Sequence, residues 1–200
     1  ATALDDKIRK IIEEEIRKAR EDVEKRKGNK DYSLTPEAMA LSSEFKNNKG
    51  KLPWPVSGTI INKFGTRINP KLNTVTENIG IDIKTNKNAS VYSVLDGVIT
   101  SITYIRNYGK TIIISHGSGY YTVYTNVENI LIRENDYILQ NTKIANVSHS
   151  VNPDISAPYY VHFQIWKDDT FRVHGIHGRS KVPTTGNLKA YPEISHVHRN

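Results

Sequence analysis

With 200 residues, 37% of them hydrophobic and 24% charged, the chain can form one packed domain with a helical appendage. Its net charge of +7 does not predict a nucleic-acid partner, because five of the basic residues lie after residue 170 and the rest are interleaved with acidic ones. No apolar run is long enough to span a bilayer, and the absence of cysteine excludes disulfides and thiolate metal sites.

The first predicted element is a helix over residues 4–27. Its opposite faces differ in character, because Glu13 with Arg17 and similar pairs place an acid four residues before a base on the charged face. The other face carries a narrow apolar stripe formed by Leu4, Ile8, Ile12, Ile16, Ala19 and Val23. Such a stripe fits two arrangements: the end of a coiled coil with a partner helix, or packing on the chain's own domain.

A second helix is expected over residues 35–47. Thr35 is a good N-cap, and Pro36 stands at the first helical position, where proline is favoured. After Gly50 the prolines of Leu52-Pro53-Trp54-Pro55 favour extended chain. Residues 1–50 are therefore predicted as a helical region, with a domain boundary near residue 51.

From Gly58 onward the pattern changes to short β-rich runs separated by turn-forming residues. The segments Asn107-Tyr108-Gly109-Lys110 and His116-Gly117-Ser118-Gly119 are short enough to close hairpins, so the sheet should be largely antiparallel. Eight strands without an intervening helix predict an all-β domain over residues 51–170, and the stretch 171–200 is predicted to be loop or disorder. The expected strands are 59–64, 91–94, 97–105, 111–115, 120–127, 137–139, 143–147 and 160–166.

Two segments stand out together, Asn78-Ile79-Gly80-Ile81-Asp82 and Tyr160-Val161-His162-Phe163-Gln164. They resemble the motifs His-x-Gly-x-Asp and His-x-His-Phe-Glu of the lysostaphin/LytM family of cell-wall zinc endopeptidases. The resemblance covers residues 52–170 and implies the family's antiparallel sheet fold, a duplicated hybrid motif. Further segments match in the family's order, namely Phe64-Gly65-Thr66-Arg67, Asp96-Gly97-Val98-Ile99, Tyr108-Gly109, Ile114-Ser115-His116-Gly117 and Tyr124-Thr125-Asn126-Val127.

In active members of this family, zinc is held by the first His, the Asp and the last His, while two further histidines handle protons. The resemblance places Asn78, Asp82 and His162 at the ligand positions, and Asn126 and Tyr160 at the proton-handling positions. An amide is a poor zinc donor beside an imidazole, and neither an amide nor a phenol with a pKa of ~10 is a good base near neutral pH. Asp82 and His162 are thus remnant ligand positions, and we expect no metal, no other cofactor and no catalytic residues.

Gln164 stands where the family has Glu and removes a further charge from the same region. The resemblance therefore implies a degenerate domain of the kind found, after a coiled coil, in EnvC-like murein hydrolase activators, which activate cell-wall amidases in bacterial division. An amidase segment would bind a groove formed by Asn78, Asp82, Asn126, Tyr160, His162 and Gln164.

The rest of the chain is assigned from the same resemblance. The 35–47 helix would lie near or over this groove as an inhibitory element, and the N-terminal coiled coil would reach peptidoglycan or a membrane division complex. The protein would be periplasmic or otherwise extracytoplasmic, although Ala1-Thr2-Ala3 shows no targeting pattern.

Other functions stay open on the sequence alone. An active zinc endopeptidase would need another ligand, for which His116 is the candidate, whereas a passive peptidoglycan-binding scaffold would need no partner enzyme. Asp82 and His162 can also simply hydrogen-bond each other across the former site. His116 can equally be a hairpin residue without a functional role, and His149 a solvated residue of a Ser-rich loop.

Overall fold

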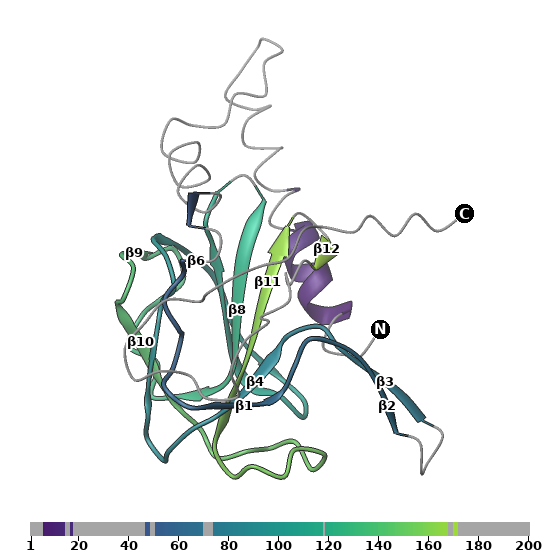
Figure 1. Cartoon of the computed structure of the whole chain (residues 1–200). Coiled ribbons are helices and arrows are strands. Elements are labelled where there is room, and N and C mark those ends of the chain that lie inside the picture. Colours follow the sequence, from purple (N-terminus) through teal and green to yellow (C-terminus); the bar gives the residue numbers. More distant parts are fainter. Residues whose placement is uncertain are drawn as a thin grey trace, which may run out of the picture.

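The computed structural model describes residues 6–14, 17, 47–48, 51–69, 74–117, 119–167 and 170–171. Within them the fold is a ten-stranded antiparallel sheet and a two-stranded ribbon, with a short N-terminal helix beside the sheet (Figure 1). The expected all-β antiparallel fold with helical structure at the N-terminus is confirmed. Apart from residue 47, the expected helix 35–47 lies outside the described residues, as does the stretch 172–200.

Most of the strands are joined by short connections, and the longest connection, residues 148–159, lies between β10 and β11. The main sheet has the order β1-β4-β11-β8-β7-β6-β9, with β12 beside β11 and with β10 pairing with both β5 and β8. The hairpins expected at residues 107–110 and 116–119 are present, joining β6 to β7 and β7 to β8. The strand bounds are β1 (Thr59–Asn62), β2 (Gly65–Asn69), β3 (Thr74–Asn78), β4 (Ile81–Lys84), β5 (Ser90–Tyr92), β6 (Gly97–Ile105), β7 (Gly109–Ser115), β8 (Tyr120–Glu128), β9 (Tyr137–Ile138), β10 (Lys143–Val147), β11 (Tyr160–Lys167) and β12 (Thr170–Phe171).

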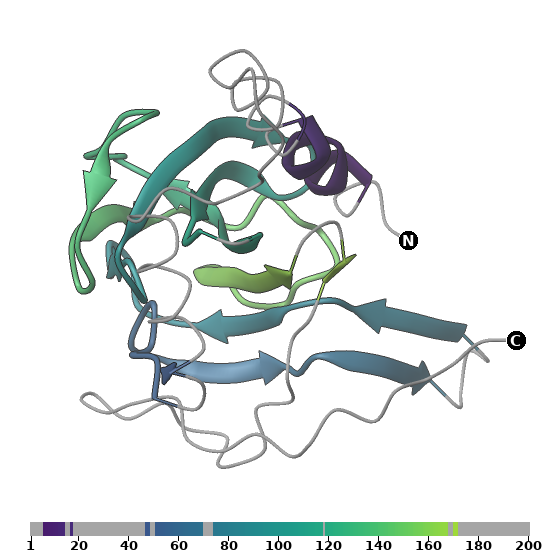
Figure 2. The ribbon, with the colours of Figure 1, turned by 90° about the horizontal axis from the view of Figure 1, so that it is seen from above.

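The first four strands form one long hairpin with a bend in the middle. β1 pairs with β4 inside the main sheet, whereas β2 and β3 pair only with each other. Figures 1 and 2 show the β2–β3 ribbon extending away from the sheet. The bend falls at residues 63–64 on one arm and 79–80 on the other, so Asn78 and Asp82 lie on either side of it.

Side chains alternate between the two faces of the sheet, and each face has its own apolar cluster. The larger cluster is the main core, to which β11 contributes Val161 and Phe163. The smaller cluster lies on the opposite face of β11 and contains Trp166 together with Val123 of β8. Because residues 160, 162 and 164 alternate with the main-core residues of β11, they share the face of the smaller cluster.

The helix, described over residues 6–14, covers part of this second face. Ile8 and Ile12, one helical turn apart, are fully buried in the smaller cluster together with Trp166. Lys7 Nζ adds a hydrogen bond of 2.8 Å to the carbonyl of Tyr104. Ile8 and Ile12 therefore pack on the chain's own domain and are not available to a coiled coil. The coiled-coil interpretation of residues 4–27 otherwise concerns residues outside those described, residue 17 apart.

Among the described residues, no helical segment is both long and apolar enough to cross a membrane.

Candidate functional site

Asp82 of β4 and His162 of β11 face each other across two neighbouring strands. The two residues are in register in the antiparallel pair, and Nδ1 of the imidazole lies 2.6 Å from Oδ1 of the carboxylate. Each residue is only 4% exposed. Asn62 of β1 donates from Nδ2 to the second oxygen, Asp82 Oδ2, at 2.8 Å. The two remnant ligand positions are thus brought together, and each satisfies the other.

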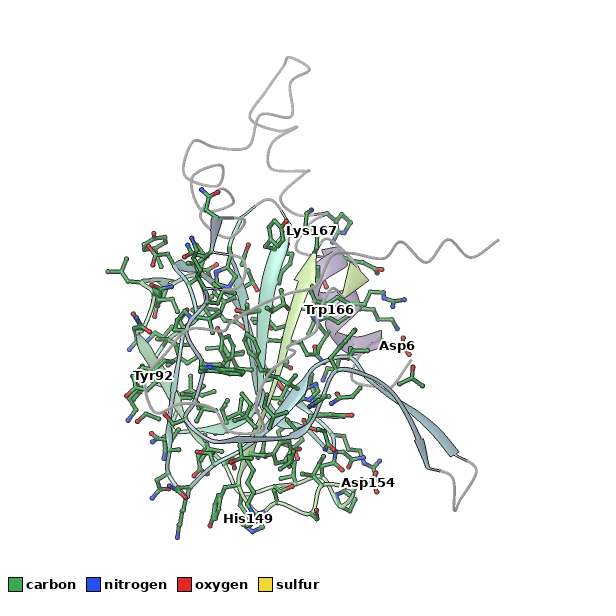
Figure 3. All side chains as sticks on the ribbon, viewed as in Figure 1. Asp6, Tyr92, His149, Asp154, Trp166 and Lys167 are labelled. Carbon is green, nitrogen blue, oxygen red and sulfur yellow. The ribbon has the colours of Figure 1, made fainter. Side chains whose placement is uncertain are left out.

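The second ring nitrogen of His162 is also occupied. His162, Gln164 and Trp166 alternate along β11 and therefore lie on one face of the strand. Gln164 Nε2 is 2.9 Å from His162 Nε2, and Trp166 Nε1 donates to Gln164 Oε1 at 2.9 Å. Both Gln164 and Trp166 are fully buried, and Figure 3 shows Trp166 at the end of β11 next to the helix. A continuous line of hydrogen bonds therefore runs from the indole to Asn62.

The amide of Asn78 is hydrogen-bonded to the backbone at the bend of the long hairpin. Its Nδ2 donates to the carbonyl of Lys63 at 3.2 Å, and its Oδ1 accepts from the backbone N–H of Gly80 at 3.3 Å. The Nδ2 contact connects the two arms of the long hairpin at its bend, whereas the Oδ1 contact lies within the arm that carries Asn78. At the position where the family has its first zinc ligand, this chain has a residue that stabilises the backbone.

Asn126 is likewise engaged with the backbone. Its φ of 61° lies in the left-handed region, which asparagine tolerates better than most residues. Its Nδ2 donates to the carbonyls of Ser148 at 3.0 Å and Tyr160 at 2.9 Å, and its own N–H donates to the carbonyl of Tyr108 at 2.8 Å. Asn126 therefore joins three segments around the site, and its side chain carries no group that can exchange a proton near neutral pH.

Tyr160 lies beside this asparagine with 1% of its surface exposed. Burial raises the pKa of its phenol, and the Asp82 carboxylate and Tyr108 raise it further, whereas Ser150 and Asn152 lower it somewhat. No described residue meets hydrogen-bond geometry with the hydroxyl, Ser150 and Asn152 included. The phenol therefore stays protonated at neutral pH and cannot accept a proton from water.

His116 belongs to the core rather than to this site. It is fully buried, with Nδ1 2.7 Å from the carbonyl of Asp96 and Nε2 2.7 Å from Oγ1 of Thr122. Desolvation by burial lowers the pKa of His116 to about 4, against a smaller raising effect of Asp96. The imidazole is therefore neutral at pH 7, and both of its nitrogens are engaged.

Strand register also separates His116 from the Asp82–His162 pair. Thr125 of β8 is opposite His162 on one side and opposite Thr111 of β7 on the other. His116 follows Thr111 by five residues along the chain, which corresponds to roughly 17 Å at the rise of an extended strand. The structure thus gives no support to the endopeptidase alternative in which His116 is recruited as a ligand.

Three residues of the site were not singled out by their sequence. Trp166 could have been predicted from the sequence, because a residue two positions after Gln164 on a strand lies on the same face as Gln164. The matched segment contained Tyr108, whose ring centroid lies 5.9 Å from that of His162, but nothing in the segment distinguished this residue. Asn62 had no signal, because its contact depends on the register of β1 against β4.

An antiparallel sheet with an Asp–His pair on two adjacent strands, framed by these motifs, defines a LytM-type domain. The model of peptidase family M23 matches residues 76–173, and the chain contains a domain of this family. Solved structures agree at the level of the fold. A zinc containing peptidase from Vibrio cholerae superimposes with a TM-score of 0.54 at 24% identity, covering 61% of this chain and 38% of that chain. A chain of the SpoIIQ–SpoIIIAH pore forming complex superimposes with a TM-score of 0.53 at 21% identity, covering 62% of this chain and 87% of that chain.

Curated relatives include proteins named murein hydrolase activator NlpD. The protein from Escherichia coli K12 is 32% identical over 95 residues, covering 47% of this chain and 23% of its own length. The one from Salmonella dublin is 32% identical over 114 residues, covering 56% and 28%. The cell division protein DipM of Caulobacter vibrioides is 26% identical over 114 residues, covering 56% and 18%. The chain thus spans about a quarter of the length of these relatives or less.

The side chains present do not fit the zinc ion that the peptidase fold implies. No group of three His, Asp or Glu side chains among the described residues is placed to hold a metal. Two ligands on a tetrahedral zinc, each about 2.0 Å from the ion, lie roughly 3.3 Å apart. Asp82 Oδ1 and His162 Nδ1 are only 2.6 Å apart, and the third position, Asn78, is hydrogen-bonded to the backbone.

Proposed function

We propose that this chain is a non-catalytic M23 domain that binds and activates a cell-wall amidase in the periplasm or another extracytoplasmic compartment. The contact between Asp82 and His162 carries the proposal, because the two side chains that would hold a metal are hydrogen-bonded to each other. The names of the relatives support a role as a regulator of murein hydrolysis. DipM, named as a cell division protein, supports a role in cell division.

The residues of this site also do not supply a general base for hydrolysis. A zinc peptidase needs a water whose pKa the metal lowers and a side chain that accepts its proton. Asn126 has no such capacity, and burial together with Asp82 raises the pKa of Tyr160. Because this set of side chains lacks a third metal ligand and a base, a binding role is the one that the geometry supports best.

The amidase contact in this proposal falls on the rim of the site. Of the six residues expected to form the groove, Asn78 alone is partly exposed, and the other five are buried. Tyr108 is also partly exposed and stacks obliquely near His162. An amidase segment would therefore touch Asn78 and Tyr108, while Asp82, Asn126, Tyr160, His162 and Gln164 hold the surface from beneath.

The proposal extends to the N-terminal region. Ile8 and Ile12 are buried on the sheet, so a coiled coil that reaches peptidoglycan or a membrane division complex would begin after residue 14. In the same proposal the 35–47 segment lies near or over the amidase contact as an inhibitory element that limits the stimulation without abolishing it.

The test uses the purified chain, a cell-wall amidase and dye-labelled peptidoglycan. The amidase alone should release dye slowly, the chain alone should release none, and the two together should release it faster. Release by the chain alone would make it a hydrolase and overturn the proposal. Binding of the chain to peptidoglycan without faster release by the amidase would identify a passive scaffold and would overturn it too.

Variants then locate the contact. Tyr108→Ala and Asn78→Ala should each reduce the amidase stimulation, because both residues lie at the rim. Tyr137→Ala is the matched control, since Tyr137 is 57% exposed on β9 at the opposite edge of the sheet from β4 and β11. If all three variants stimulate the amidase as strongly as the wild type does, this rim is excluded as the contact.

A further inference from the structure

The hydrogen bonds along β11 have only one consistent direction. An indole nitrogen is a donor and never an acceptor, so Trp166 Nε1 fixes the oxygen of the Gln164 amide on its own side, at 2.9 Å. The NH₂ group of Gln164 must then face His162 Nε2, also at 2.9 Å. Because an NH₂ group only donates, Nε2 has to carry a lone pair.

This direction determines where the proton of His162 lies. With a lone pair on Nε2, the ring proton sits on Nδ1 and is donated to Asp82 Oδ1 at 2.6 Å. We infer that Gln164, oriented by Trp166, holds His162 in the Nδ1–H tautomer and thereby removes the lone pair that a metal would need on the nitrogen facing Asp82. Gln164 is a positioning residue in this inference, since it acts only through the imidazole.

The surroundings keep this arrangement in place. Gln164 and Trp166 are fully buried, so bulk water does not compete for their hydrogen bonds. Trp166 belongs to the apolar cluster that also contains Ile8 and Ile12 of the helix. The N-terminal helix and the tautomer of His162 are thus connected through one indole ring.

A single substitution should place a proton on Nε2. The Gln164→Glu carboxylate offers two acceptors: one oxygen still accepts from the Trp166 N–H, and the other now demands an N–H from His162 Nε2. With the ring proton held on Nε2, zinc can displace the proton on Nδ1 and bind there, which is the arrangement that an outer-shell carboxylate produces for ligating histidines in general. The exchange of one amide nitrogen for an oxygen therefore decides whether His162 can serve as a ligand.

The direct test is nitrogen NMR of the imidazoles in the full chain labelled with ¹⁵N. Long-range proton–nitrogen correlations distinguish a protonated from an unprotonated ring nitrogen, and the His162→Gln variant assigns the signals. In the wild type, Nε2 should be unprotonated and Nδ1 protonated, whereas Gln164→Glu should protonate Nε2. Asn129→Asp, an amide-to-carboxylate change at an exposed position, should leave the His162 pattern unchanged. A wild-type Nε2 that carries a proton overturns the inference even if the Gln164→Glu variant fails to fold.

A second measurement uses zinc alone as the probe. Asn78→His adds an imidazole as a third ligand beside Asp82 and His162, but it leaves the tautomer of His162 unchanged. The double variant Asn78→His with Gln164→Glu should bind zinc roughly 10–100-fold more tightly than Asn78→His by itself, as for other outer-shell partners. Equal zinc affinities in calorimetry would contradict the inference. Neither measurement contains an amidase, so a failure of the proposed function and a failure of this inference give different results.

Discussion

Acidification should destabilise the chain through His116. The imidazole is fully buried between Asp96 and Thr122, and desolvation lowers its pKa from 6.5 to about 4. The folded protein therefore keeps His116 neutral in a pH range where the unfolded chain protonates it. Protonation of the folded state would place a charge on a ring that burial has removed from water.

The size of the effect follows from the two pKa values. The contribution of His116 is complete above the unfolded pKa of 6.5 and is lost progressively as the pH falls toward the folded value of about 4. At 1.36 kcal/mol for each pKa unit, the full loss is about 3 kcal/mol. That is a large fraction of the roughly 5–15 kcal/mol by which such domains are stable.

The assay is urea denaturation between about pH 7 and about pH 4, together with NMR titration of the imidazoles. Wild type should lose about 3 kcal/mol more over this range than His116→Gln, which has no proton to take up. His149→Gln, which removes an exposed imidazole, should keep the wild-type pH dependence. A His116 titration midpoint near 6.5, or equal pH slopes for wild type and His116→Gln, would refute the reasoning.

Two further predictions concern packing around the site. Ile12→Ala should weaken the docking of the helix by about 2–5 kcal/mol, which would appear as faster hydrogen exchange in residues 6–14. The control Glu13→Ala, at an exposed position, should change the stability by no more than about 0.5 kcal/mol. Equal exchange rates in the two variants would show that Ile12 does not anchor the helix. Gly80→Ala should cost about 1–3 kcal/mol in thermal or urea unfolding, because its Cβ would lie 2.5 Å from the carbonyl of Phe163 and 2.8 Å from His162 Cε1. An unchanged midpoint for Gly80→Ala would mean that β4 and β11 are not packed this closely.

The central hairpins were predictable because their signals are local. Asn107 and Gly109 have φ values of 67° and 74°, and these are the residue types that adopt the left-handed region most readily. The flanking runs alternate apolar residues and contain many β-branched side chains, which indicates strands without any knowledge of the partners. The β6–β7 and β7–β8 pairs follow from these features.

The long hairpin was not predictable to the same extent. The β2 and β3 segments read Gly-Thr-Arg-Ile-Asn and Thr-Val-Thr-Glu-Asn, with too few apolar residues to indicate a strand. β4 has four residues, one of them Asp82, and its strand conformation depends on pairing with both β1 and β11. Such pairing is non-local, so no window of the sequence contains it. β12, with two residues, is below the length that a pattern can indicate.

For the site, motif order predicted the residue positions better than it predicted their roles. The hydrogen bond between Asp82 and His162 was one of the open alternatives, and it is present. The backbone contacts of Asn78 and Asn126 depend on the bend at residues 63–64 and 79–80 and on a positive φ, neither of which residue identity specifies. The sequence therefore indicated that a ligand position is substituted, but it did not indicate the structural role of the new residue.

The retention of Asp82 and His162 does not by itself indicate metal binding. A carboxylate that is 4% exposed at the centre of a sheet needs hydrogen-bond donors, and removing one partner of a buried pair usually costs more than the pair contributes. Asn62 and His162 supply those donors, while Gln164 and Trp166 complete the line on the other side of the imidazole. Folding alone thus gives a reason to keep both residues after the third ligand and the base have changed. The residue that separates a structural pair from a metal site is then Gln164, because it determines which nitrogen of His162 carries the proton.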